Sequence, residues 1–98
     1  MDTRPSHALA RSRPQIRRIV EAHRACNPRV FGSAARGDDT VQSDLDLLVD
    51  ATDRTSLFDI AGIELDLEAL LGVPVHVTTT GTLRGALRER VLAEAQPV

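Results

Sequence analysis

The segment from Val30 to Asp50, "VFGSAARGDDTVQSDLDLLVD", constrains the fold more than any other part of this chain. It connects two short apolar runs through a loop of small and acidic residues, and the second run opens on Asp44-Leu45-Asp46. Because side chains alternate along a strand, Asp44 and Asp46 are expected on one face, about 6.5 Å apart along the chain, while Leu45 points into the core. The segment therefore predicts two strands of one sheet that carry a pair of carboxylates.

The carboxylate pair predicts a site for a hard divalent cation. Two like charges this close together are unfavourable unless a counter-ion neutralises them. Mg²⁺ is the natural candidate, because it takes carboxylate oxygens together with substrate phosphate oxygens. Asp44 and Asp46 are therefore the predicted metal ligands and catalytic residues.

The turn at Gly32-Ser33 predicts a phosphate-binding loop. A strand that ends in Gly-Ser and continues into "SAARG" forms a short helical turn whose free N–H groups face outward, where phosphate binds. Gly32 permits close backbone approach, Ser33 adds a hydroxyl donor, and Arg36 can reach phosphate or brace the loop by pairing with an acid. Because the loop and the carboxylate pair lie on adjacent strands, a nucleoside triphosphate can bridge them, as nucleotidyl transfer requires.

The rest of the pattern predicts an α+β (α/β) fold, in which helices pack on one small β-sheet. A helix at 12–25 is expected to have Ser12 as its cap, with Gln15 completing a capping box, and a helix at 56–72 is expected to have Ser56 or Thr55 as its cap. The other expected elements are a turn and strand at 27–32, strands at 45–50 and 73–79, and a last helix at 82–95.

The length predicts a single domain at residues 12–98, preceded by a loose N-terminal arm at residues 1–11. The core must be aliphatic, because the only aromatic residues are two Phe. In the helix at 56–72 the core stripe is expected from Leu57, Ile60, Ala61, Leu67, Leu70 and Leu71, and in the last helix Leu83, Leu87 and Val91 are expected to share one face.

Charge and composition exclude several classes of protein. Residues 1–30 carry seven Arg and two acids, whereas residues 31–72 carry ten acids and two Arg. An acidic centre argues against the whole domain lying on DNA. No apolar run is long enough to span a membrane, the N-terminus lacks the apolar region of a secretory signal, and the single Cys26 suits a reducing compartment. The sequence therefore predicts a cytoplasmic protein that contacts neither a membrane nor DNA.

The motif block resembles the signature of one enzyme family. Gly32-Ser33, ten intervening residues and Asp44-x-Asp46 resemble the G-S-x10-D-x-D motif of minimal nucleotidyltransferases, small relatives with the polymerase-beta-like nucleotidyltransferase fold. The similarity continues through "LFDIAGIELDLEALLGVPVHVTT" and covers roughly residues 13–92. It implies the small mixed sheet with packed helices of that fold.

The resemblance also implies a function and a partner. Minimal nucleotidyltransferases of this size typically accompany a HEPN-domain protein, a helical RNase toxin. They act as antitoxins that move AMP from ATP onto a tyrosine of that partner, with which a hetero-oligomer is implied. Carried over to this chain, Gly32 and Ser33 would hold the triphosphate and Arg36 would steady the site. Asp44 and Asp46 would ligate Mg²⁺.

The sequence departs from the family at His76. The family usually places a third carboxylate on the next strand, in a pattern like L-G-x-x-V-D-V, where this chain has "LLGVPVHV". An imidazole removes one negative charge and prefers softer cations than Mg²⁺, although it can serve as a base near neutral pH. Three readings follow: His76 is the catalytic base of a slow enzyme, Glu64 or Asp66 enters the site instead, or the transferase is weakened or inactive.

Two functions from different classes stay open. One is an ATP- and Mg²⁺-dependent adenylyltransferase antitoxin. The other is an antitoxin of the same fold that neutralises the toxin by binding alone, through the apolar face of the last helix and the Arg-rich first helix. Transfer to a small molecule is a weaker alternative, because the chain is short for a second domain that would hold such a substrate.

Overall fold

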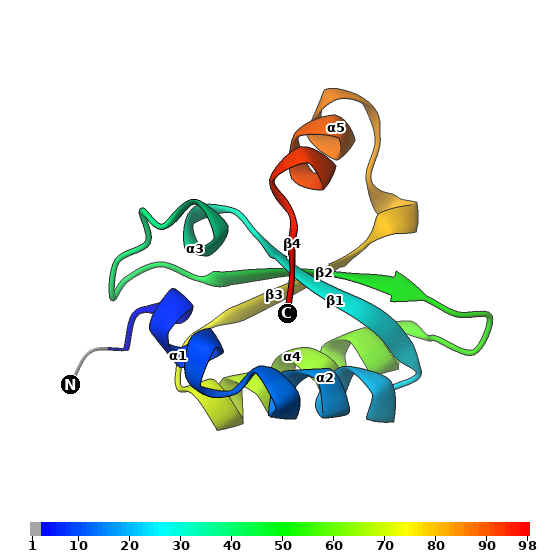
Figure 1. Cartoon of the computed structure of the whole chain (residues 1–98). Coiled ribbons are helices and arrows are strands. Elements are labelled where there is room, and N and C mark those ends of the chain that lie inside the picture. Colours follow the sequence, from blue (N-terminus) through cyan, green and yellow to red (C-terminus); the bar gives the residue numbers. More distant parts are fainter. Residues whose placement is uncertain (1–2) are drawn as a thin grey trace.

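A computed structural model describes residues 3–98, which form one four-stranded sheet in the order β3-β2-β1-β4 (Figure 1). β1 is antiparallel to β2 and β4, whereas β2 and β3 are parallel, so the predicted small mixed sheet is confirmed. The elements are α1 (Pro5–Arg11), α2 (Arg13–Ala22), β1 (Ala25–Phe31), α3 (Ser33–Arg36), β2 (Leu45–Ala51), α4 (Leu57–Leu71), β3 (Val75–Thr79), a 3-10 turn η1 (Thr80–Thr82), α5 (Gly85–Glu94) and β4 (Gln96–Pro97).

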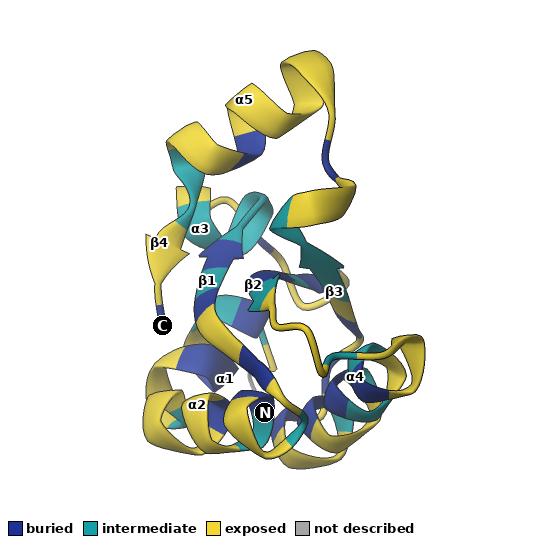
Figure 2. Ribbon diagram, turned by 90° about the vertical axis from the view of Figure 1, so that its right-hand side faces the viewer, coloured by how far each residue is buried: buried dark blue, intermediate teal, exposed yellow. Residues whose placement is uncertain are grey.

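The sheet separates two layers of helices. Helices α1, α2 and α4 lie against one face, whereas α3 and α5 lie on the other (Figure 1). Alternation along β2 divides its side chains between these layers, as predicted. On the α5 side, Leu48 packs with Leu83 and Val91 in a small cluster, and most of α5 is exposed (Figure 2). On the α2 and α4 side, the fully buried residues of β2 are Leu45, Leu47 and Val49.

Strand β1 begins earlier than the sequence predicts and contains an irregularity. Its pairing with β2 shifts register between Cys26 and Arg29. Within that interval Asn27 takes a positive φ of 54°, and Pro28 has no N–H to donate to a neighbouring strand. The expected turn before the strand is therefore a bulge inside it.

The N-terminal region differs from the predicted loose arm at residues 1–11. Residues 5–11 form helix α1, while residues 1 and 2 lie outside the described part of the chain. Pro5 occupies the first turn, where its missing N–H costs nothing, and Ala8 and Leu9 are buried in the main core. Burial of this short helix, rather than its local sequence pattern, accounts for its presence.

Helix α1 is capped by a residue far along the chain. The Asp39 carboxylate is fully buried and accepts the Ser6 backbone N–H at 2.8 Å and the Ser6 hydroxyl at 3.0 Å. The Arg4 guanidinium donates to the same carboxylate at 3.2 Å. These contacts attach α1 to the loop between α3 and β2, which leads into the paired aspartates.

Ser12 occupies the predicted position before α2, which begins at Arg13, but the predicted capping hydrogen bond to its side chain is absent. The predicted cap at Ser56 is confirmed: its hydroxyl accepts the Asp59 backbone N–H, and the Asp59 side chain accepts the Ser56 N–H in return. Gly72 ends α4 in the left-handed conformation, as expected.

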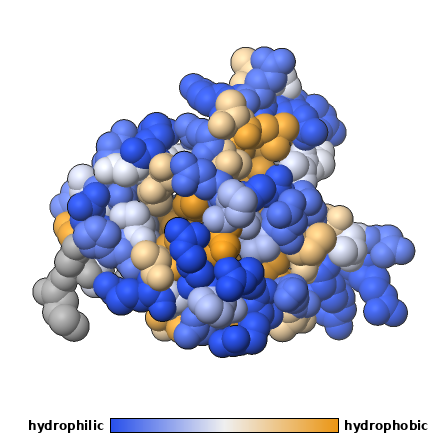
Figure 3. Space-filling view, viewed as in Figure 1, coloured by the Kyte–Doolittle hydropathy of each residue, from blue (hydrophilic) through white to orange (hydrophobic). Residues whose placement is uncertain are grey.

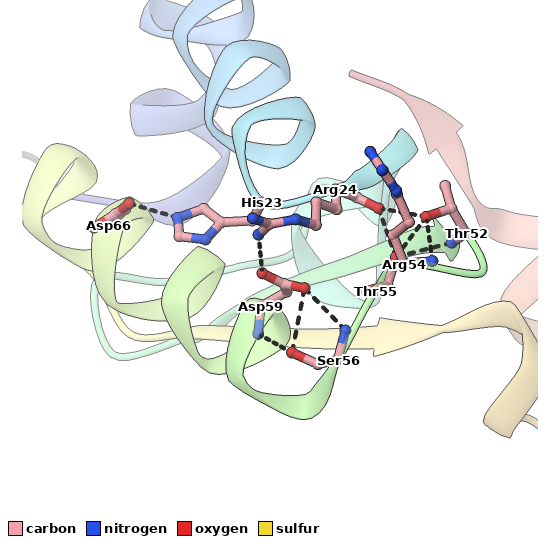
Figure 4. A network of polar contacts seen from close by, with 8 residues as sticks. All are labelled: His23, Arg24, Thr52, Arg54, Thr55, Ser56, Asp59 and Asp66. Atoms are coloured by element: carbon pink, nitrogen blue, oxygen red, sulfur yellow. Dashed lines mark hydrogen bonds and ion pairs between the residues drawn. The ribbon is translucent and has the colours of Figure 1, made fainter.

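A polar network joins the end of α2 to α4 (Figure 4). His23 Nε2 lies 2.7 Å from Asp66 Oδ2, and the Arg24 guanidinium donates to Asp59 Oδ1 at 3.0 Å. The Thr55 hydroxyl donates to the Arg24 carbonyl. His23 is thus a packing residue at the α2–α4 contact.

The core stripe of α4 is displaced from the predicted one. Leu57 and Leu70 were expected inside, but they are 86% and 41% exposed. Ala61 is exposed as well, whereas the predicted Leu67 and Leu71 are buried and Ile60 is half-buried against the core. Ile63, which was not predicted, is fully buried. Because α4 is apolar nearly all round, its periodicity does not distinguish the buried side from the exposed one.

The face shown in Figure 3 is largely hydrophilic, with hydrophobic spots between the polar side chains. The most exposed large apolar side chains lie on α4, where Leu57 is 86%, Phe58 89% and Leu65 67% exposed. The three apolar residues expected to share one face of the last helix are divided: Leu83, which precedes α5, and Val91 are buried, whereas Leu87 is 51% exposed. Among residues 3–98, no helix has the length and apolar character to cross a membrane.

Replacing Asp39 by Asn should destabilise the fold by about 1–3 kcal/mol near neutral pH, because an amide cannot accept all three hydrogen bonds. Burial would raise the pKa of Asp39, but the hydrogen bonds from Ser6 and Arg4 outweigh it and hold that pKa below its ordinary value. A carboxyl with a depressed pKa adds stability above its unfolded value, about 3.9, and loses it as the pH falls through the folded value. The difference between wild type and variant, measured by urea unfolding, should therefore shrink below about pH 4.

Asp53→Asn, in the exposed loop before α4, is the matched control and should leave the free energy of unfolding nearly unchanged. Equal destabilisation by the two substitutions would contradict the capping role of Asp39. So would a difference for Asp39→Asn that persists undiminished at about pH 3.

Candidate functional site

The backbone of Gly32 lies directly against the Asp46 side chain. Strand pairing positions them, because Phe31 at the end of β1 lies opposite Asp46 in β2. Gly32 has φ 72° and ψ −154°, a backbone conformation essentially confined to glycine. A Cβ at this position would lie 2.5 Å from Oδ2 of Asp46. The absence of a side chain therefore lets the turn before α3 pass directly over the carboxylate.

Asp44 and His76 lie beside this contact. Asp44 immediately precedes β2, and His76 of β3 pairs with Asp46 in the parallel ladder. Nε2 of His76 lies 2.9 Å from Oδ2 of Asp44, and the two side chains are 63% and 43% exposed. The predicted site residues from three separate segments are thus brought together at one place on the sheet.

The charge of Asp46 is unfavourable in the free protein. Burial raises the pKa of this carboxyl above its ordinary value. The carboxylates of Asp44 and Glu94 raise it further, whereas His76 and Arg36 oppose the shift. A half-buried acid among like charges favours either a proton or a bound cation. Such a perturbed carboxyl is typical of functional sites.

The donors of the Gly32 turn face a carboxylate from the other end of the chain. The Gly32 N–H donates to Oε1 of Glu94 at 2.8 Å, and Arg36 Nη1 lies 3.3 Å from both Glu94 oxygens. Arg36 also donates to Asp38 at 3.3 Å, and these hydrogen bonds raise the pKa of Arg36. Of the two roles considered for Arg36, bracing the loop by pairing with acids is the one the structure contains. Glu94 was missed from the sequence because it lies 62 residues from Gly32 and belongs to no motif.

The acids suggested as substitutes for the missing third carboxylate are engaged elsewhere. Glu64 Oε2 accepts the Val77 N–H at 2.9 Å, and Asp66 is bonded to His23. Both acids belong to α4, on the opposite face of the sheet from α3 (Figure 1). This geometry contradicts the reading in which Glu64 or Asp66 enters the site.

The donor set fits a metal ion that arrives together with a nucleotide. Within residues 3–98, no three or more acidic, histidine or cysteine side chains are grouped to hold a metal by themselves. Mg²⁺ is commonly held by one or two carboxylates while substrate phosphates complete its coordination, and Asp44 and Asp46 can supply that pair. The described chain forms no enclosed pocket, so a substrate would meet this group on an open surface.

Comparison with known proteins shows which family this chain belongs to. Residues 15–98 match the family described as "Nucleotidyltransferase domain". The "Putative protein adenylyltransferase MJ0435" of Methanocaldococcus jannaschii is 35% identical over 80 residues, which are 82% of this chain and 86% of the relative. The "Protein adenylyltransferase MntA" of Thermococcus cleftensis is 40% identical over 65 residues, 66% of each chain.

Solved structures share the fold over most of the chain. One described as "Structure of putative minimal nucleotidyltransferase" is 42% identical, with a TM-score of 0.86 over 100% of this chain and 97% of that one. A second is described as "Crystal structure of the toxin-antitoxin with AMP-PNP". It has a TM-score of 0.74 at 19% identity, over 86% of this chain and 69% of that one, and this likeness is one of fold. The resemblance inferred from the Gly32–Asp46 block is therefore confirmed.

Gly32→Ala should destabilise the protein by about 1–3 kcal/mol and weaken nucleotide binding at least tenfold. The added Cβ would clash with the Asp46 carboxylate, and alanine would have to adopt a backbone conformation that L-residues avoid. Urea unfolding measures the first effect, and titration with a fluorescent ATP analogue measures the second. Gly81→Ala is the control, since no atom lies within 4 Å of its added Cβ. Indistinguishable behaviour of the two variants would rule out the close approach at Gly32.

Proposed function

The chain belongs to the nucleotidyltransferase domain family, and we propose that it is a cytoplasmic antitoxin that transfers AMP from ATP to a tyrosine of a cognate HEPN-domain RNase toxin. The observation that carries the proposal is the Gly32 turn lying over Asp46, with Asp44 alongside. It combines backbone donors for phosphate with carboxylates for a cation. The names of the relatives, protein adenylyltransferases, support ATP as donor and a protein as acceptor.

The proposed reaction exchanges one phosphorus–oxygen bond for another. The tyrosine hydroxyl oxygen attacks the α-phosphorus of ATP, the bond to the bridging oxygen breaks, and pyrophosphate leaves with that electron pair. The hydroxyl proton passes to a base. A divalent ion, when bound with the nucleotide at Asp44 and Asp46, supplies positive charge that offsets the charge of the phosphates.

Each site residue has a proposed role in that reaction. Gly32 and Ser33 hold the triphosphate through the backbone N–H and the hydroxyl of the turn. Arg36 steadies the turn and adds positive charge beside it. His76 is the proposed base, because its imidazole is exposed beside Asp44, which orients Nε2.

Two observations support a protein partner for this chain. The toxin–antitoxin complex with AMP-PNP shares its fold. In addition, α4 exposes three large apolar side chains, Leu57, Phe58 and Leu65, which a protein partner can cover. The partner's HEPN identity rests on the resemblance of the motif block.

A binding-only antitoxin is the second candidate, favoured by His76 itself. This residue stands where the family has a third carboxylate, and its Nε2 lies 2.9 Å from an Asp44 oxygen that a metal would need. A weakened site of this kind could be retained while the protein neutralises the toxin by contact.

Asp44→Asn and Asp46→Asn should each reduce AMP transfer at least 100-fold, because each removes a carboxylate that holds the cation near the phosphates. The purified protein is mixed with ATP, Mg²⁺ and the toxin, and the mass of the toxin is measured. Asp53→Asn is the control and should transfer AMP at the wild-type rate. Neutralisation of toxin RNase activity by both site variants, with no adduct formed by the wild type, would establish the binding-only alternative.

His76→Asp should slow transfer at least tenfold near neutral pH, because it removes the proposed imidazole base. Faster transfer at limiting Mg²⁺ would show instead that a third carboxylate beside the pair serves the site better than this histidine. His76→Ala removes the imidazole without adding a carboxylate, so it separates the loss of the base from the gain of negative charge. If both variants are slower than wild type and lose the same pH dependence, the imidazole is the base and its replacement by carboxylate is no gain.

A further inference from the structure

Two of the donors at the Gly32 turn, the Gly32 N–H and the Arg36 guanidinium, already contact a carboxylate of the same chain. Glu94, the last residue of α5, accepts the Gly32 N–H at 2.8 Å. Both of its carboxylate oxygens also lie 3.3 Å from Arg36 Nη1. The Glu94 side chain is 22% exposed and that of Arg36 is 51% exposed, so the carboxylate is partly buried against the turn while the Arg36 side of the pair faces solvent.

The Glu94 carboxylate occupies the place that a substrate phosphate would need. One backbone N–H cannot donate a full hydrogen bond to two anions, and the Arg36 guanidinium group is turned toward Glu94 and Asp38. Glu94 also adds to the negative charge around Asp46. An incoming triphosphate therefore meets a filled donor and an additional repulsive charge.

We propose that Glu94 is a built-in competitor for the nucleotide phosphates, which must displace it from Gly32 and Arg36 before the triphosphate can bind. The inference rests on the proposed use of the Gly32 turn as a phosphate site, and it adds that Glu94 sets the affinity of that site. Displacement frees one carboxylate and transfers the Gly32 N–H to a phosphate oxygen.

The fold permits Glu94 to leave while the chain beyond it stays attached. Helix α5 contacts the sheet through a small cluster that includes Leu48, Leu83 and Val91, and its other surfaces are exposed (Figure 2). Just beyond Glu94, β4 pairs with β1, and the Arg17 guanidinium donates to the Val98 carbonyl. Release therefore requires a side-chain rotation or a tilt of α5, and no separation of the sheet.

Binding of a phosphate probe tests the proposal directly. Isothermal titration with inorganic tripolyphosphate, and separately with ATP and Mg²⁺, is carried out on wild type, Glu94→Gln and Glu94→Ala. Both variants should bind tripolyphosphate more tightly, by roughly fivefold to tenfold for Glu94→Ala, because the competing charge is gone. Glu89→Gln removes the same charge from an exposed position of α5 and should match wild type.

The Gly32 amide provides a readout that does not depend on affinity. In wild type its N–H should exchange slowly with solvent, and in Glu94→Ala exchange should be faster by NMR. Tripolyphosphate should restore protection in the variant. Fast exchange in both proteins would overturn the proposal, because Glu94 would then not hold the donor in solution.

The outcomes separate this inference from the proposed function. Unchanged or weaker tripolyphosphate binding in both Glu94 variants overturns the inference, even if the wild type transfers AMP to the toxin. Tighter tripolyphosphate binding in the variants supports it, even if no AMP transfer is detected and the antitoxin acts by binding alone. An equal gain for Glu89→Gln overturns it, since general charge reduction would explain the effect.

Discussion

The passage of the Gly32 backbone over the Asp46 carboxylate is the contact around which the site is organised. It requires a residue without a Cβ, and it requires the end of β1 to be paired with the start of β2 in one register. A shift of one residue would turn Asp46 into the core and Leu45 toward the turn. Leu45 and Leu47 therefore fix the position of the acids, because this register buries the two leucines and places the acids on the other face of the sheet.

The balance of charge follows from this arrangement. Burial, together with Asp44 and Glu94, raises the pKa of Asp46, while His76 and Arg36 oppose that shift. The groups of the site pair with one another, His76 with Asp44 and Glu94 with the Gly32 turn. Under the proposed function, a nucleotide and its cation would replace these internal partners.

Two features of the fold escaped the sequence for identifiable reasons. Helix α1 has no local capping residue, and its N-terminus is satisfied by Asp39, which lies 33 residues from Ser6. Local patterns contain no information about a cap at that distance. In α4 the residues are apolar on nearly every side, so Leu57 could not be distinguished from Ile63 until the helix was docked on the sheet. The Ser56 cap and Gly72 stop were predictable, because those signals lie within the helix ends themselves.

The sequence by itself determined the alternation of β2, the glycine at the turn and the spacing between Gly32-Ser33 and Asp44-x-Asp46, because short-range geometry controls all three. The resemblance to minimal nucleotidyltransferases implied that His76 stands on the strand where that family usually has a carboxylate. Only the tertiary structure decided that His76 meets Asp44, that Glu64 and Asp66 lie on the far side of the sheet, and that Glu94 reaches the turn. Those contacts join segments distant in the chain, and packing of the helices on the sheet, rather than any local pattern, sets which side chains meet.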